Sequence, residues 1–135
     1  MKLNLDSAIT MIQAAEEKAS AIGVPMVVTV VDAGANMVAQ HRMDGALLAS
    51  IDISKNKAYT AVATQMPTSD LAAAGQPGQP LFGIHSCDHS RLVIFGGGFP
   101  IRHEGELIGG IGVSGGSVEQ DMACGQAGLA AFNLQ

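Results

Sequence analysis

The first apolar pattern along the chain has the repeat of a helix. Apolar residues recur at intervals of three and four from the start of the chain: Leu5, Ala8, Ile9, Ile12, Ala15, Ala19 and Ile22. This spacing places them on one face of an amphipathic helix of about 17 residues. Asn4 or Asp6 supplies the N-cap, and Gly23 followed by Pro25 ends the helix.

The next segments have strand patterns. Residues 25–31 are rich in β-branched side chains and too short for a helix, residues 32–36 supply turn residues, and residues 37–42 return as a partner strand. Together they predict a β-hairpin. Asp44 and the glycine after it end the hairpin and cap a second helix, predicted over about residues 46–64.

The second half of the chain alternates loops with short apolar runs. Residues 66–80 are rich in Pro, Gly, Ala and Gln, which predicts a long surface loop with at most one helical turn, typical of a lid or binding loop. Three short strands are expected over residues 92–95, 99–102 and 107–113. A Ser-x-x-Gln capping box then opens a terminal helix over residues 117–132.

This order of elements predicts an α+β fold. Strands come in antiparallel groups without βαβ alternation, so we expect one five-stranded antiparallel sheet with helices packed over it, and no Rossmann fold. No internal repeat or linker divides the sequence. The chain is therefore predicted to form a single domain over residues 1–135.

Composition narrows the class of protein. The 135 residues are 47% hydrophobic and 14% charged, which predicts a packed core and excludes a disordered tail. The net charge of −5 and the absence of a basic run exclude a nucleic-acid partner. No apolar window reaches the length of a membrane span, and no signal-peptide core is present, so we expect a cytoplasmic protein without membrane contact.

The cysteines and the low charge carry two further expectations. Cys87 and Cys124 are too few and too far apart for a disulfide framework, and Cys87 is predicted to be an ordinary buried thiol. Few charges, 17 glycines and no tryptophan predict an unusually apolar surface. Such a surface is most easily hidden between subunits, so a homo-oligomer is expected.

Two glycine clusters each follow an apolar run. Gly96, Gly97 and Gly98 form the first, and Gly115 and Gly116 form the second, next to the predicted terminal helix. We expect both clusters to line a ligand pocket, where backbone N–H groups at the helix start would hold a carboxylate, phosphate or propionate. The alternative is a tight turn that lets strand and helix pack closely.

The sequence contains a dinucleotide-binding motif but lacks the other features of such a site. Residues 110–115 match G-x-G-x-x-G after a strand and before a helix. No second parallel strand follows, and no acidic residue stands at the expected ribose position. Neither a nicotinamide nor a flavin cofactor is therefore expected.

A short histidine segment is a candidate metal or haem-iron site. His85 and His89 flank a thiol and a carboxylate, and all of these groups are ligand types for zinc, iron or haem iron. The segment is predicted to be a loop, where the two rings need not converge. The alternative interpretation is a pair of solvated loop histidines.

Four charged residues are candidates for ligand binding: Asp32, Arg42, Asp44 and Lys57. Lys57 lies on a helix face of small residues, where it would hold an anion or form a Schiff base; the alternative is a surface lysine with a solvated ammonium. Arg42 would clamp a carboxylate. Asp32 and Asp44 follow or precede turns, where a carboxylate normally caps backbone N–H groups.

Eight segments in this order resemble the GlcG/HbpS-like family of small haem-binding or haem-degrading domains, also fused to one type of corrinoid adenosyltransferase: residues 30–34, 42–46, 49–53, 57–61, 66–68, 95–100, 109–116 and 119–121. The resemblance implies a profilin-like α/β/α sandwich with a five-stranded antiparallel sheet, and homo-oligomers. It also implies haem or tetrapyrrole binding in some members, while others accompany glycolate, glycerol or diol catabolism. Asp32, Arg42, Asp44, Lys57 and the glycine clusters lie on the matching positions.

Two classes of function stay open at this point, beside a third possibility, a subunit that only supports an enzyme assembly. The first is a small oligomeric protein that binds haem, a related tetrapyrrole or an anionic metabolite, with or without haem-degrading activity. The second is a cofactor-free or metal-dependent enzyme for a carboxylated metabolite. It would use Lys57, Asp32 or a histidine as acid or base, and Arg42 as the clamp.

Overall fold

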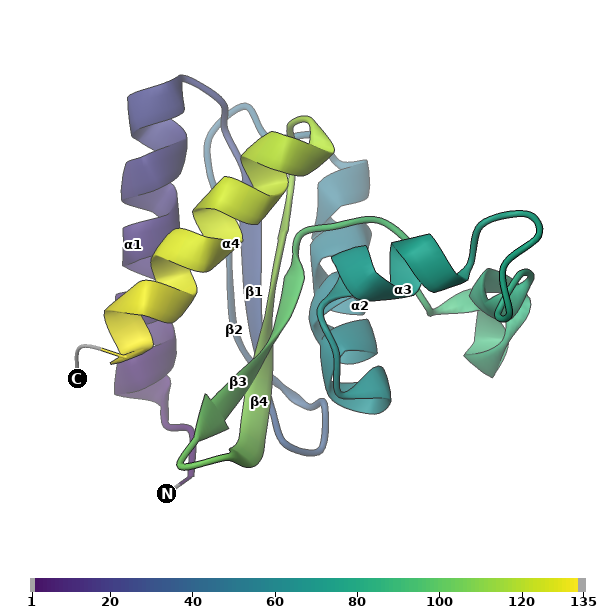
Figure 1. Cartoon of the computed structure of the whole chain (residues 1–135). Helices are drawn as coiled ribbons and strands as arrows, with labels where there is room; N and C mark the ends of the chain where they lie inside the picture. Colours follow the sequence, from purple (N-terminus) through teal and green to yellow (C-terminus); the bar gives the residue numbers. More distant parts are fainter. Residues whose placement is uncertain (1, 134–135) are drawn as a thin grey trace.

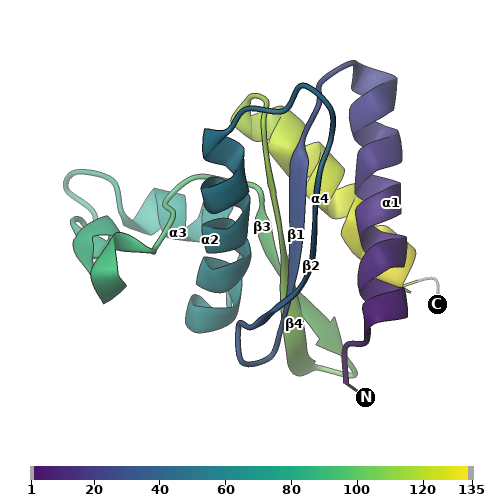
Figure 2. The same ribbon diagram turned by 180° about the vertical axis from the view of Figure 1, so that it is seen from behind.

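A computed structural model describes residues 2–133 and shows a central sheet between layers of helices (Figures 1 and 2). The helices and strands in chain order are α1 Leu5–Ile22, β1 Val27–Asp32, β2 Met37–Arg42, α2 Ala49–Thr64, α3 Thr68–Ala74, β3 Gly98–His103, β4 Glu106–Ser114 and α4 Val118–Asn133. Short 3₁₀ turns at Ile84–Ser86 and Asp88–Ser90 lie between α3 and β3.

The sheet is antiparallel, and its four strands have the order β2-β1-β4-β3. β1 is central: Val28 pairs with His41 of β2 on one side and with Val113 of β4 on the other. The predicted hairpin of β1 and β2 is confirmed. None of the helices between residues 2 and 133 is long and apolar enough to cross a bilayer.

The prediction of a fifth strand is wrong. Residues 92–95 have no strand structure, although all four are apolar and Val93 and Ile94 are β-branched. Their backbone binds a helix instead, because the N–H of Val93 donates to Thr60 Oγ1 on α2 at 3.0 Å. A run of high strand propensity stays outside the sheet when another partner takes its backbone donor.

The ends of α1 follow the predicted capping residues, but the prediction that Asp44 caps α2 is wrong, because Leu48 holds the N-cap position without a side-chain cap. Asn4 Oδ1 accepts from the N–H of Ser7 at 2.8 Å, and Gly23 ends α1 in the left-handed conformation. Two predicted boundaries need correction: α2 begins at Ala49, later than expected, and the predicted loop after Met66 contains the seven-residue helix α3, more than the single turn expected.

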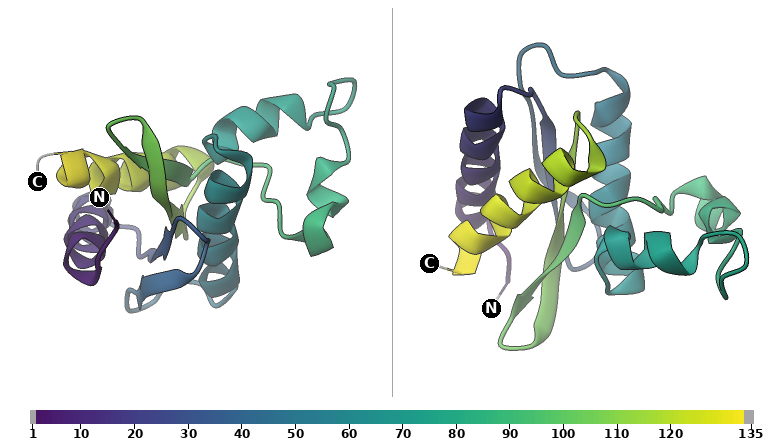
Figure 3. Two further views of the ribbon diagram at one scale, coloured as in Figure 1. Left: turned by 90° about the horizontal axis from the view of Figure 1, so that it is seen from below. Right: turned by 45° about the horizontal axis from the view of Figure 1, so that its top comes forward.

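The helices cover both faces of the sheet (Figure 3). α1 and α4 pack against each other on one face, and α2 packs on β4, β1 and β3 on the other. The main core lies under α1 and α4 and includes Met11, Ile12, Val28 and Ile111, all fully buried. The expected antiparallel sheet with flanking helices is confirmed.

Glycines let α2 lie unusually close to the sheet. A Cβ atom on Gly110 of β4 would lie 2.7 Å from the carbonyl oxygen of Ala58, and one on Gly98 of β3 would lie 2.5 Å from that of Lys57. Any side chain at these positions would force the helix outward. Gly110, the first glycine of the G-x-G-x-x-G segment, thus lets β4 pack closely against α2.

One segment leaves the sandwich. Residues 75–97, between α3 and β3, leave the body on the side of α2 and then run back to β3, and we call them the arm (Figures 1 and 3). The arm contains both 3₁₀ turns, with three consecutive residues in the left-handed region, Asp88, His89 and Ser90. It returns across α2 before β3 begins, so it brings distant residues of the sequence next to that helix.

Candidate functional site

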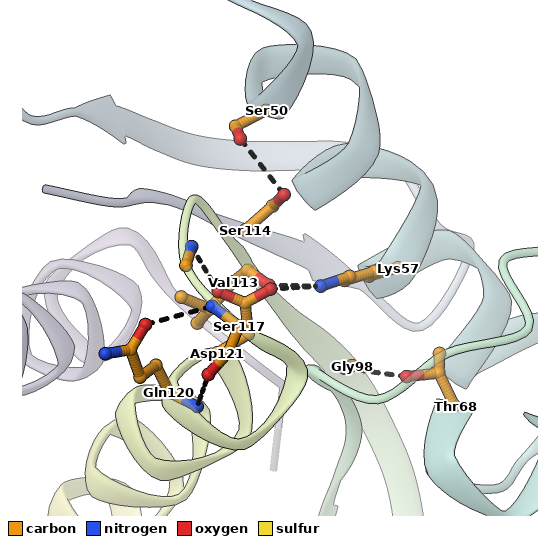
Figure 4. A network of polar contacts seen from close by, with 10 residues as sticks. Ser50, Lys57, Thr68, Gly98, Val113, Ser114, Ser117, Gln120 and Asp121 are labelled. Atoms are coloured by element: carbon orange, nitrogen blue, oxygen red, sulfur yellow. Dashed lines mark hydrogen bonds and ion pairs between the residues drawn. The ribbon is translucent and has the colours of Figure 1, made fainter. Parts of the chain in front are cut away.

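The inner face of α2 holds a buried charge. Lys57 is fully buried, and its Nζ donates to Asp121 Oδ2 at 2.9 Å and to the carbonyl oxygen of Val113 at 2.8 Å (Figure 4). The same ammonium lies 5.1 Å from the centroid of the Phe95 ring. The interpretation of Lys57 as a solvated surface lysine is therefore wrong. This ion pair joins α2, β4, α4 and the end of the arm.

Asp121, the partner of Lys57, also binds the backbone next to α4. Its Oδ1 accepts from the N–H of Gly116 at 2.9 Å, just before α4 begins. Ser117 and Gln120 form the predicted capping box: the Ser117 N–H donates to Gln120 Oε1, and the Gln120 N–H donates to Ser117 Oγ. These three N–H groups near the start of α4 thus bind acceptors of the chain itself.

Burial and pairing act on Lys57 in opposite directions. Loss of water lowers the pKa of Lys57, while the hydrogen bond and the charge of Asp121 oppose that change. The chain also closes tightly around the ammonium. Gly97 has φ +127, and a Cβ atom there would lie 2.6 Å from Lys57 Nζ. Because Lys57 is fully buried, a ligand could reach this ammonium only if the surrounding chain moved.

The glycine clusters face the chain's own atoms. A Cβ atom on Gly96 would lie 2.5 Å from the sulfur of Met122, and one on Gly115 would lie 2.6 Å from the carbonyl oxygen of Pro25. In this structure both clusters allow close contacts within the protein.

The other charged candidates lie apart from Lys57. Asp32 Oδ1 accepts from the N–H groups of Gly34 and Asn36, both at 2.9 Å, and so caps the turn between β1 and β2. Arg42 Nη2 donates to the carbonyl oxygen of Ala46 at 3.1 Å. Arg42 and Asp44 line one open hollow of about 610 Å³. The structure brings these two together, but it does not bring Asp32, Arg42 and Lys57 into one site.

The histidine candidates are on the arm. His85 and His89 lie in the successive 3₁₀ turns and are exposed. Among residues 2–133, no three or more His, Cys, Asp or Glu side chains are grouped so that they could hold a metal ion. Cys87 between them is exposed, so its prediction as a buried thiol is wrong. Cys124 is buried, and burial raises the pKa of its thiol.

A cleft that the sequence did not reveal lies between α2 and the arm. It measures about 660 Å³, and its walls come from residues 34–37, from α2 residues between Asp52 and Tyr59, and from residues 89–91. We call it the α2–arm cleft. Its volume is in the range of small-molecule sites, about 300–1,000 Å³. Of the sequence candidates, it contains His89.

One wall of this cleft carries an exposed ionic cluster. The hydroxyl of Tyr59 donates to Asp88 Oδ2, and Arg91 Nη2 donates to Asp88 Oδ1 at 2.6 Å. The guanidinium of Arg91 lies 4.1 Å from the centroid of the Tyr59 ring. Hydrogen bonds from Tyr59 and Arg91 lower the pKa of Asp88, and the bond to Asp88 raises the pKa of Tyr59.

Sequence reasoning missed this cluster because its partners are far apart. Tyr59 and Asp88 are separated by 29 positions, and no local pattern connects them. The chain contains a single tyrosine, which stands on the outer side of the predicted second helix. That lone aromatic hydroxyl was the one available signal.

The chain is similar to a known protein family and to several known proteins. The family described as "Haem degrading protein HbpS-like" matches residues 3–130. The chain is 46% identical over 131 residues to an uncharacterised 15.0 kDa protein in the dhaT-dhaS intergenic region of Citrobacter freundii, covering 97% of this chain and 92% of that protein. It is 41% identical to the corrinoid adenosyltransferase PduO of the same organism, over all of this chain but 40% of PduO.

A solved structure extends the similarity to three dimensions. The crystal structure of a PduOC:heme complex superimposes with a TM-score of 0.95 at 42% identity, covering 98% of this chain and 96% of that one. The match over residues 3–130 includes every element of the fold except the end of α4. The chain therefore belongs to the HbpS-like family, as its motifs predicted.

Proposed function

We propose that this chain binds haem, with an imidazole of the arm as an iron ligand. The observation that carries the proposal is the likeness to PduOC, which was solved with haem, at a TM-score of 0.95. Membership of a family described by haem chemistry points the same way. When bound, haem would supply redox and ligand-binding chemistry that the side chains lack.

The arm fits haem by the chemistry of its side chains. His85 and His89 are exposed, and imidazole nitrogen is a common axial ligand of haem iron. Leu81 and Phe82, close in sequence to His85, are 40% and 62% exposed. Apolar side chains of this kind suit the faces of a porphyrin.

A haemin titration of four histidine variants tests this proposal. The unaltered chain should give a saturable Soret band at about one haem per subunit. The double variant His85→Ala with His89→Ala should lose that band, while the single variants show which ring binds iron. The matched control replaces His41 and His103, which lie on β2 and β3, and should keep the band.

The titration distinguishes a chain that does not bind haem from one whose iron ligand lies outside the arm. A chain that gives no saturable Soret band does not bind haem, and the proposal is then wrong. A band that survives the arm variants but disappears in the His41 and His103 control moves the iron ligand from the arm to the sheet.

Haem degradation is the second candidate, and the family's description favours it. The haem-loaded chain is incubated with a reductant and oxygen, and the Soret band is followed together with released iron. Loss of the band with release of iron, faster than for free haemin, supports degradation. An unchanged band limits the function to binding.

We also propose self-association. Leu47, Leu48 and Phe82 are 63%, 73% and 62% exposed, in a chain with 14% charged residues. Exposed large apolar side chains of this kind are typical of surfaces covered by another subunit. Light scattering at micromolar concentration should show more than one chain per particle, and a stable monomer contradicts the proposal.

A further inference from the structure

The acidic groups at the α2–arm cleft already have donors from the chain. Asp52 Oδ2 accepts from Asn56 Nδ2 at 2.9 Å. Asp88 accepts from the Tyr59 hydroxyl and from Arg91. Asp88 is therefore partly neutralised by Arg91, whereas Asp52 keeps its charge and is held by a neutral amide.

Three side chains at this cleft have donors that bind no other part of the described chain. Lys55 is exposed, and its ammonium makes no hydrogen bond or ion pair with any residue between 2 and 133. Within the same range, the Ser90 hydroxyl and the His89 imidazole make no hydrogen bond. These three side chains offer donors to a ligand that brings acceptors.

Arg91 adds a cation that is held in place. Its Nε and Nη2 donate to the backbone and side chain of Asp88, and its plane lies over the Tyr59 ring. No bond from Nη1 is formed within the described chain, and 43% of the side chain is exposed. A guanidinium fixed by two bonds and an aromatic face loses little freedom when it binds a further acceptor.

We infer that the α2–arm cleft is a carboxylate-binding site, with Lys55 and Arg91 as its cations and His89 and Ser90 as further donors. Lys55 comes from α2 and Arg91 from the arm, so a carboxylate between them would join the two. The carboxylate has two sources, the propionates of haem or a free small carboxylate. The first source rests on the proposed function.

A thermodynamic cycle tests the propionate source. Haemin and haemin dimethyl ester, whose propionates carry no charge, are titrated into the unaltered chain and into Lys55→Gln. Lys55→Gln should weaken the binding of haemin by about two- to tenfold, because one exposed ion pair contributes modestly to affinity. The affinity for the ester should stay within about twofold. Lys18→Gln, an exposed lysine on α1, is the matched control and should change neither.

Succinate tests the free source in the haem-free chain. Amide NMR signals of residues 34–37, 55–56 and 89–91 should shift with succinate, and Lys55→Gln should weaken the binding by a similar factor. Equal affinities for haemin in all three proteins, together with no succinate shifts at the cleft, overturn the inference. Shifts produced by inorganic phosphate alone overturn its carboxylate specificity.

Failure of the proposed function is visible separately. A chain that never gives a Soret band contradicts haem binding, and the succinate titration then decides the cleft by itself. A chain that binds haemin and its ester equally well in every variant, and ignores succinate, keeps haem binding and loses the carboxylate site.

Discussion

Two ionic clusters lie on α2, two residues apart, and they face opposite environments. Lys57 points inward and is fully buried with Asp121 and the carbonyl oxygen of Val113. Tyr59 points outward, where it binds Asp88 and supports Arg91 beside an open cleft. The same helix thus uses a buried charge to join the layers and a neutral hydroxyl to support an ionic cluster at the surface.

The two clusters differ in their access to water. A buried charge that loses its partner stays without solvent, so breaking the pair costs far more than forming it contributes. An exposed charge that loses its partner is solvated again, and the loss is small. The inner cluster should therefore govern the stability of the fold, and the outer cluster should govern the arm and the cleft.

The largest effect is expected for Lys57→Met. This change leaves Asp121, 4% exposed, buried without its cation, and should lower the free energy of unfolding by about 3–5 kcal/mol. Urea unfolding measures it. Adding Asp121→Leu should restore part of the loss, because the second change removes the unpaired carboxylate. A loss under about 1 kcal/mol in the single variant contradicts the structural role.

Gly97→Ala should come next. Backbone strain at φ +127 costs about 1–3 kcal/mol, and contact of the new Cβ with Lys57 Nζ adds to it. Gly78→Ala is the matched control, because Gly78 also has a positive φ, +84, but open space around it. Unfolding midpoints should show a larger loss at Gly97. Equal losses of stability in the two variants would mean that the ion pair moves aside for the new methyl group at no cost.

Thr60→Val should loosen the arm. Thr60 Oγ1 accepts from the N–H of Val93, and its loss leaves that donor unpaired, at a cost of about 1–3 kcal/mol. Thr64→Val is the control, since the Thr64 hydroxyl donates within α2, to the carbonyl of Thr60. Hydrogen exchange at Val93 should rise in the first variant alone; unchanged exchange there removes Thr60 as the anchor.

The smallest change in global stability is expected for Asp88→Asn. The chain has one tyrosine and no tryptophan, so phenolate absorbance reports Tyr59 alone. The hydrogen bond to Asp88 raises the pKa of Tyr59, and Asp88→Asn should bring it down toward its ordinary value. Asp70→Asn, on the exposed side of α3, should leave the titration unchanged. If the pKa of Tyr59 is the same in both variants, the hydrogen bond between Tyr59 and Asp88 is contradicted.

The outer cluster should also respond to acid. Tyr59 and Arg91 lower the folded-state pKa of Asp88, so its contribution is complete above the unfolded pKa, about 4. That contribution is lost as the pH falls through the lower, folded value. Arm amides should therefore exchange faster at the acid end of this window, and exchange in Asp88→Asn should lack this dependence.

Local patterns determined much of the fold. The α1 caps at Asn4 and Gly23 and the capping box of Ser117 and Gln120 depend on neighbours within a few positions, and all are as predicted. The order of the motifs also identified the family, whose match spans residues 3–130. These features need no knowledge of distant partners, because the interactions that cause them are local.

Only the tertiary structure decided the partners. Residues 92–95 have the propensity of a strand, yet Thr60 binds the N–H of Val93 outside the sheet. The helical pattern placed Lys57 on a face of small residues, but its carboxylate lies 64 positions away. Tyr59 and Asp88, 29 positions apart, meet only because the arm folds back over α2. Propensity and spacing describe neighbours along the chain, whereas charge pairing and clefts depend on which distant segments the packed core brings together.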